Sequence, residues 1–449
     1  MSQPPSRLRS NLSLFIGLWL GLTLVAGLSV FALVYWMMAP ASRNPVATLA
    51  PAATAPPPTV SLLTALPATL PPEGAGGGGP ACNWLDLPAS GFGYGVQSHV
   101  FGGGDNAYWM TMVRDKLHFQ WVKIQVRWKD LELAPGQIFW DVLDGGMNEA
   151  CNNGLRVMLS VVAAPDWSNA NPLPAPEGQE APPDDYQTYA NFIAALIDRY
   201  PGKIGAIEVW NEMNLEREWN TAAGISPVEY TKMLALAYTT IKSKDANIIV
   251  IAGALSPTGI NCAGTYPACG GGRTIVMDDA TYLTQFVQEG GLQYADCIGT
   301  HSNGTNLPPT ADALNPPGTA EGKAFTGPWN NPHYSWSLKS QVEKYASILN
   351  GQKQQCVTEF GYASAVNGVY PAGYEFAADI NEQQQAEYLV EAFNWMRDSG
   401  QVKLAFLFNL NYGPLGGDPA SDDNVVFSLL AKEGFGRPAF EAMGAMEKP

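Results

Sequence analysis

Two carboxylates, Glu212 and Glu359, stand where strand-forming runs of this sequence end. The segment 204–212 is rich in β-branched residues before it reaches Asn211 and Glu212, and the segment 355–359 repeats this pattern with Glu359 at its end. One alternative for the first segment is a helix N-cap at Asn211 or Asn214 with Glu212 in the first helical turn. The second strand that ends on a carboxylate favours chemistry instead. Two carboxylates facing each other across a sugar-sized gap can cleave a glycosidic bond, since one protonates the leaving oxygen and the other attacks carbon or activates water.

The elements that must position these residues form a regular alternation along residues 81–449. Apolar strand-like runs are separated mostly by helical patterns, which predicts a parallel sheet covered by helices. Eight such runs predict a closed (β/α)8 TIM barrel. They are Phe92–Ser98, Trp121–Arg127, Leu155–Ala163, Ile204–Asn211, Ile248–Ala254, Cys297–His301, Cys356–Phe360 and Val402–Asn409. Helices are predicted at Tyr186–Tyr200, Val228–Lys242, Tyr282–Glu289, Ser337–Leu349 and Glu382–Ser399.

An open doubly wound sheet is the competing α/β architecture. Such a sheet usually carries a glycine-rich phosphate loop with GxGxxG spacing after its first strand. Here the first strand leads to residues 99–104, which lack both that spacing and a helix start. The sequence therefore favours the barrel.

In a parallel barrel the active site lies at the C-terminal ends of the strands. Besides the two glutamates, these ends carry polar residues that we predict to bind substrate, namely His99, Arg127, Asn211, His301 and Asn409. Below them, Lys123 and Glu208 each stand four residues before a mouth residue, so we predict that they pair inside the barrel. The alternative is that Lys123 extends toward one end of the barrel without this partner.

The chain before the barrel divides into three parts. Residues 1–11 carry arginines and no acid, and residues 12–38 form an uncharged apolar run of 27 residues, which is long enough to span a bilayer. We therefore expect a cytoplasmic N-terminus, a single transmembrane anchor and an external catalytic domain. Residues 39–80, rich in Pro, Ala, Thr and Gly, are expected to be a disordered linker. The alternative is a secreted protein that is cleaved within Ala39–Ala41.

Charge and cysteine content narrow the class of partner. Of the 25 basic and 41 acidic residues, only three basic residues and one acidic residue precede position 81, so the barrel is strongly acidic. This excess of negative charge argues against a nucleic-acid partner. No spacing of Cys and His residues indicates a metal, and none is expected. Six cysteines suit an oxidising compartment, and we predict a Cys262–Cys269 disulfide. If His301 and Glu359 both face inward, strict alternation puts Cys297 inward and Cys356 outward, which argues against their pairing.

Several motifs resemble those of one group of enzymes. Residues 207–214, Ile-Glu-Val-Trp-Asn-Glu-Met-Asn, resemble the strand-four signature of the clan A glycoside hydrolases, and residues 357–361 resemble their strand-seven nucleophile segment. Ala164-Pro165-Asp166-Trp167 and the segment 436–440 are similar to two further clan segments. Within the clan, the chain most resembles the cellulase-like and the β-xylosidase-like bacterial polysaccharide hydrolases. The resemblance covers about residues 91–446.

The resemblance implies a role for each matched position. Glu212 would be the acid/base, protonated at working pH, and Glu359 the nucleophile of a retaining β-glycosidase that acts on an oligo- or polysaccharide without a cofactor. Asn211 would bind the sugar 2-hydroxyl, Arg127 would keep Glu359 ionised, and His301 would line the adjacent subsite. One departure concerns strand eight, where the clan commonly has Trp and this chain offers Phe408 or Asn409.

Aromatic residues after the strands are candidates for stacking on sugar rings. We predict this role for Trp128, Trp167 and Tyr362, with a place in the core or in anchoring a loop as the alternative. Two other functions remain open at this point. The barrel could bind glycans at the cell envelope without catalysis, or it could transfer a glycosyl group to another sugar.

Overall fold

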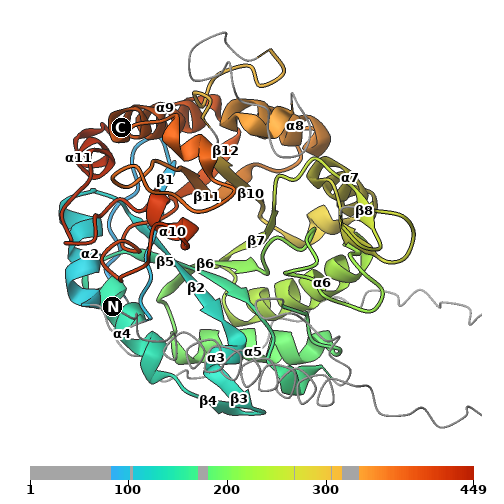
Figure 1. The fold of residues 1–449 in the computed structure, drawn as a ribbon. Coiled ribbons are helices and arrows are strands. Elements are labelled where there is room, and N and C mark those ends of the chain that lie inside the picture. The colour runs from blue at the N-terminus through green and yellow to red at the C-terminus, as the bar shows by residue number, and fades with distance from the viewer. Residues whose placement is uncertain (1–81, 102–104, 170–179, 267, 305, 316–332) are drawn as a thin grey trace, which may run out of the picture. The chain divides into compact units, whose positions relative to one another are not determined.

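The computed structural model describes residues 82–101, 105–169, 180–266, 268–304, 306–315 and 333–449. Eight parallel strands close into a barrel in the order β1-β12-β11-β10-β7-β6-β5-β2, and helices surround them (Figure 1). The strands are β1 Gly93–Gln97, β2 Trp121–Arg127, β5 Arg156–Val162, β6 Ile204–Val209, β7 Ile249–Leu255, β10 Cys297–Gly304, β11 Gln355–Tyr362 and β12 Val402–Leu407. All eight predicted strands are confirmed, and the (β/α)8 barrel with them.

The predicted helices are confirmed as well, with ends shifted by at most three residues. The longer helices are α2 Asn106–Asp115, α4 Asp141–Asn152, α5 Tyr186–Arg199, α6 Pro227–Lys244, α7 Asp279–Gln288, α8 Leu338–Leu349, α9 Glu382–Ser399 and α11 Pro438–Ala445. Side-chain caps define several starts: Ser226 caps α6 ahead of Pro227, and Asn381 forms a capping box with Gln384 at α9. Shorter elements lie in the loops, including α3 Trp128–Leu131, α10 Asp423–Phe427 and the hairpins β3–β4 (Glu132–Ala134, Gln137–Ile138) and β8–β9 (Cys262–Ala263, Thr274–Val276).

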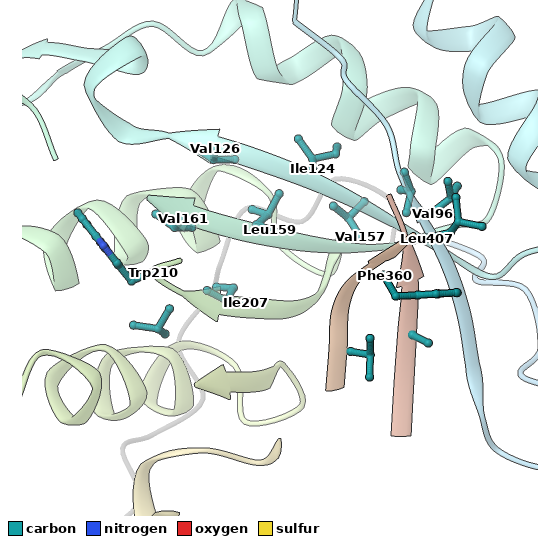
Figure 2. Close-up of a cluster of buried hydrophobic side chains, with 14 of the residues drawn as sticks. Val96, Ile124, Val126, Val157, Leu159, Val161, Ile207, Trp210, Phe360 and Leu407 are labelled. Atoms are coloured by element: carbon teal, nitrogen blue, oxygen red, sulfur yellow. The ribbon is translucent and has the colours of Figure 1, made fainter. Parts of the chain in front are cut away.

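Alternation along each strand separates two layers of core. One set of side chains packs between strands and helices, and Figure 2 shows Ile124 and Val126 of β2, Val157, Leu159 and Val161 of β5, and Ile207 of β6 in this layer. The other set fills the barrel interior. Its lowest layer is apolar and contains Trp121, Met158, Ala206, Ile251, Cys297, Cys356, Leu404 and Phe406.

The interior layer corrects one prediction. Cys297 and Cys356 form a disulfide, as do the predicted pair Cys262–Cys269 and the pair Cys82–Cys151. Strict alternation fails because β11 carries an extra residue: Thr300 pairs with Val357, but His301 pairs with Glu359. This bulge lets Cys356 and Glu359 both face inward although they are three residues apart.

The predicted anchor 12–38 and linker 39–80 lie outside the described residues. Within the described ranges, no helix is both long enough and apolar enough to cross a bilayer.

Candidate active site

Glu212 is aimed into the barrel mouth by an unusual turn after β6. Trp210 and Glu212 both have positive φ, 72° and 39°, a conformation that residues other than glycine adopt rarely. Hydrogen bonds hold this turn: the Trp210 indole donates to Glu218 O at 2.8 Å, and the Glu212 amide donates to Ala254 O at 2.8 Å. The same segment that resembles a catalytic signature is thus held rigidly by the neighbouring strand.

Glu359 lies across the mouth on β11 and shares a partner with Glu212. His301 Nδ1, on β10, is 3.0 Å from Glu212 Oε1 and 3.9 Å from Glu359 Oε2. The two carboxylate oxygens are therefore no more than about 7 Å apart, the sum of these two distances. Retaining glycosidases place their carboxyl groups about 5–5.5 Å apart and inverting ones about 6.5–9.5 Å apart, so this upper limit includes the retaining spacing and the lower edge of the inverting range.

A buried lysine provides the charge that stabilises ionised Glu359. Lys123 Nζ donates to Glu359 Oε1 at 2.7 Å and lies 3.7 Å from Glu208 Oε2. The predicted Lys123–Glu208 pair is confirmed, and Thr358 Oγ1 also donates to Glu208 at 2.7 Å. Burial alone would raise the pKa of Glu359, but nearby His301 and Lys123 outweigh it and lower that pKa. Glu359 is therefore ionised at neutral pH, as a nucleophile must be.

Glu212 is also held in its charged form, which contradicts the expected protonated acid. Burial would raise its pKa, but Arg217 and His301 lower it below the usual value for a glutamate. Arg217 Nη2 contacts Glu212 Oε2 directly. This compensating charge comes from a loop residue five positions after Glu212, and the strand pattern of the sequence did not predict it.

The two carboxylates line a cleft of about 740 Å³ at the barrel mouth. Other lining residues are Gln97, His99, Phe101, Gln125, Arg127, Asn211, Arg217, Glu218, Asn303, Tyr374, Phe408, Tyr412, Leu415–Gly417, Asp422–Asn424 and Phe427. Phe408 rather than Asn409 occupies the strand-eight position that faces the cleft. The volume falls within the range of small-molecule sites, roughly 300–1,000 Å³.

Several buried polar atoms around this cleft have no hydrogen-bond partner among the described residues. They are both amide atoms of Gln97, His99 Nε2, Asn211 Oδ1 and Asn303 Oδ1. Burial lowers the pKa of His99 to about 3, so its imidazole is neutral and can donate or accept one hydrogen bond at Nε2. Unpaired buried polar groups are costly, and a ligand with many hydroxyl groups would satisfy these atoms.

Arg127 does not hold Glu359 as predicted. Its guanidinium lies at the cleft edge and pairs with Glu180 Oε1 at 2.9 Å and Asp130 Oδ2 at 3.1 Å. Lys123 lies deeper in the barrel than Arg127 because it stands four residues earlier on β2. Its fully buried side chain therefore reaches Glu359, and that of Arg127 does not. Arg127 remains a cleft residue.

Four predicted sugar-binding residues serve the packing of the barrel instead. Trp128 is fully buried, stacks on Phe192 at 5.2 Å between ring centroids and donates to Glu132. Trp167 packs edge-on against Trp128 and donates to Glu132 O. Tyr362 is buried against Tyr388, and the amide of buried Asn409 bonds to the Asn424 carbonyl and the Tyr412 amide. None of the four lines the cleft as the described residues form it.

Other cleft residues were missed because they lie on loops without a strand pattern. Glu218, Tyr374 and the run 422–424 belong to segments whose path the sequence did not predict. Arg217 and Glu218 could have been found from one signal, since they are charged residues directly after the Asn-Glu segment.

A separate group, Asp278, Asp279 and His333, could hold a metal ion, since one ligand atom from each lies within 4.8 Å of the others. All three residues already have structural partners: Asp278 caps α7, Asp279 Oδ2 accepts a hydrogen bond from Tyr345 at 2.8 Å, and His333 Nδ1 lies 2.7 Å from Ser335 Oγ. None of the three lines the cleft as described, so we assign no cofactor to the site.

The described fold is shared with solved glycoside hydrolases. No family model matches the sequence. A family 39 glycoside hydrolase from Bacteroides cellulosilyticus is 16% identical, with a TM-score of 0.55, 81% of this chain covered and 65% of that enzyme. A family 39 enzyme from Xanthomonas axonopodis has a TM-score of 0.52 at 16% identity, with 80% of this chain and 67% of that chain covered. A family 39 β-xylosidase from Caulobacter crescentus has a TM-score of 0.51 at 16% identity, covering 80% and 72%. The chain spans about two thirds of the length of these enzymes, and at this identity the likeness is one of fold: the barrel is built like those of clan A glycoside hydrolases.

Proposed function

We propose that the protein is a retaining β-glycosidase in which Glu359 is the nucleophile and Glu212 the acid/base. The observation that carries this proposal is the contact of one buried imidazole, His301, with both of the carboxylates that line the cleft. His301 itself lies behind them and does not line the cleft as the described residues form it. Glu359, paired with buried Lys123, attacks the anomeric carbon, and Glu212 protonates the departing oxygen. Glu212 then accepts a proton from water as the glycosyl-enzyme is hydrolysed.

The unsatisfied atoms around the cleft support a carbohydrate as the substrate. Gln97, His99, Asn211 and Asn303 offer donors and acceptors to hydroxyl groups. We assign the sugar 2-hydroxyl to Asn211, which lines the cleft and precedes Glu212 in the chain. Phe408 and Tyr412 offer apolar ring surface in the same cleft. A panel of aryl β-glycosides and polysaccharides tests this, with β-xylosides included because one structural neighbour is a β-xylosidase. Turnover that depends on both Glu212 and Glu359 is expected, whereas no turnover of any member would contradict the proposal.

We also propose that residues 12–38 anchor the enzyme in a membrane with the barrel outside the cytoplasm. The three disulfides support an oxidising compartment, since they join all six cysteines of the chain. The intact protein should then fractionate with membranes and resist carbonate extraction. External protease should release an active fragment by cutting within 39–80. A soluble mature protein that begins near Ser42 would contradict the anchor.

A further inference from the structure

Arg217 lies between two carboxylates of the cleft. Its Nη2 contacts Glu212 Oε2, and its Nε is 3.7 Å from Glu218 Oε1. The Arg217 side chain is 59% exposed, whereas those of Glu212 and Glu218 are 7% and 18% exposed. The guanidinium can therefore move without disturbing buried packing.

The backbone around Arg217 is fixed, so movement is confined to the side chain. Arg217 O accepts a hydrogen bond from the Glu180 amide at 2.6 Å, and the Glu218 amide donates to Leu215 O at 3.1 Å. The Trp210 indole holds Glu218 O. The two carboxylates therefore flank one exposed guanidinium on a backbone that hydrogen bonds hold in place.

Glu218 differs from Glu212 in its charge state. Burial, and then the nearby charge of Glu212, raise the pKa of Glu218 to about 7. A substantial fraction of Glu218 is therefore protonated at neutral pH. A guanidinium that moved to Glu218 would favour its ionised form instead.

The titratable groups that face Glu212 come from several elements. His301 lies on β10, Glu359 on β11, Arg217 and Glu218 on the loop after β6, and Tyr374 on the segment before the short helix η4 Glu375–Ala378. A general acid must carry a proton when the glycosidic bond breaks. Arg217 favours the ionised form of Glu212 and so opposes its protonation. Of the charged side chains in this group, Arg217 is the exposed one.

We propose that Arg217 is a displaceable counter-ion of Glu212, which the leaving-group part of the substrate moves onto Glu218. The inference rests on the proposed glycosidase function. The exchange balances: Glu218 loses a proton as it receives Arg217, and Glu212 gains a proton as it loses Arg217. Once the leaving group has departed, Arg217 returns and stabilises the ionised Glu212 that acts as base. Arg217 is therefore a positioning residue. Its position determines whether Glu212 is protonated in the first half of the reaction and ionised in the second.

Two substrates with one sugar and different leaving groups test this role on the full-length protein. A phenyl β-glycoside needs protonation of its leaving oxygen, whereas a 2,4-dinitrophenyl β-glycoside does not; the sugar is the one turned over best in the panel. Arg217→Gln should move the high-pH limb of kcat/KM for the phenyl glycoside upward by about one pH unit or more, because a neighbouring cation lowers a carboxyl pKa by about 1–3 units. The dinitrophenyl profile should not move.

Two further variants separate this effect from a disturbed loop. Glu218→Gln removes the receiving carboxylate, so the limb for the phenyl glycoside should move to lower pH, opposite to Arg217→Gln. Arg273→Gln removes an arginine that pairs with Glu216 in the same loop without touching Glu212, and should move neither profile. The role of Arg217 would be overturned if the high-pH limb of kcat/KM moved in neither Arg217→Gln nor Glu218→Gln. It would also be overturned if the limb moved equally for the phenyl and the dinitrophenyl glycoside. Neither result would contradict the glycosidase activity. No turnover by the wild type would overturn both.

Discussion

Glu359→Ala is expected to lose activity on every glycoside, by about 10⁴-fold or more, whatever the leaving group. The reason is that Glu359 contacts Lys123 at 2.7 Å and lines the cleft, whereas Glu208, the other carboxylate near Lys123, does not line the cleft as described. Azide can enter the space left by the side chain and attack the β-glycoside from the opposite face. Any rescued product should therefore be the α-glycosyl azide, identified by proton NMR.

Glu212→Ala should behave differently because it removes the proton donor and not the nucleophile. On a dinitrophenyl glycoside the enzyme should still form its covalent intermediate and then stall, while substrates with poor leaving groups should slow by roughly 10²–10⁴-fold. Azide needs no base and should restore turnover, giving the β-glycosyl azide.

A third cleft carboxylate serves as the matched control for both variants. Asp423 lines the cleft and accepts a hydrogen bond from Tyr374 at 2.5 Å. Asp423→Ala should give no glycosyl azide of either configuration. If the two azide products came from the opposite variants, the roles of Glu212 and Glu359 would be reversed.

Lys123→Met is expected to be strongly destabilising. It leaves Glu208 and Glu359 buried without their shared cation, which should lower the free energy of unfolding by about 3–5 kcal/mol. The pKa of Glu359, which Lys123 helps His301 to lower, should rise. Since the nucleophile must be ionised, the low-pH limb of kcat/KM should then move to higher pH. Denaturant unfolding and a pH–rate profile measure the two effects.

Two variants test whether lost charge or lost packing lowers the free energy of unfolding of Lys123→Met. Lys129, just after β2, is a partly exposed lysine that pairs with Glu180. Lys129→Met should lower the free energy of unfolding by no more than about 1 kcal/mol. Adding Glu208→Gln to Lys123→Met should recover part of the stability, because one buried charge is then removed. A Lys123→Met protein as stable as the wild type would contradict the proposed charge balance.

The fold could be predicted because each strand is a separate apolar run with its own ends. Trp121–Arg127 and Glu382–Ser399 were predicted to the residue, since a period of two and a capping box define them locally. The Cys297–Cys356 bond could not be predicted, because it depends on one extra residue in β11 that no local pattern reveals.

The predicted residues that do line the cleft stand on a strand or within three residues of its end. His301 was placed near Glu359 by register, and it also contacts Glu212. The basic residue that contacts Glu359 is the one that lies deep enough in the barrel. Lys123 therefore pairs with Glu359, whereas Arg127 pairs with Glu180. Trp128 follows a strand, as a mouth residue would, but the turn into α3 directs its ring to the core. Arg217 lies on a loop whose path depends on distant contacts such as that with Glu180.

The central claim is that the reaction proceeds with retention through Glu359. Proton NMR of the first-formed sugar, recorded before mutarotation, tests it most directly on the best substrate of the panel. Double displacement across the gap that His301 bridges predicts that a β-glycoside first releases the β-anomer. Initial release of the α-anomer would contradict the mechanism.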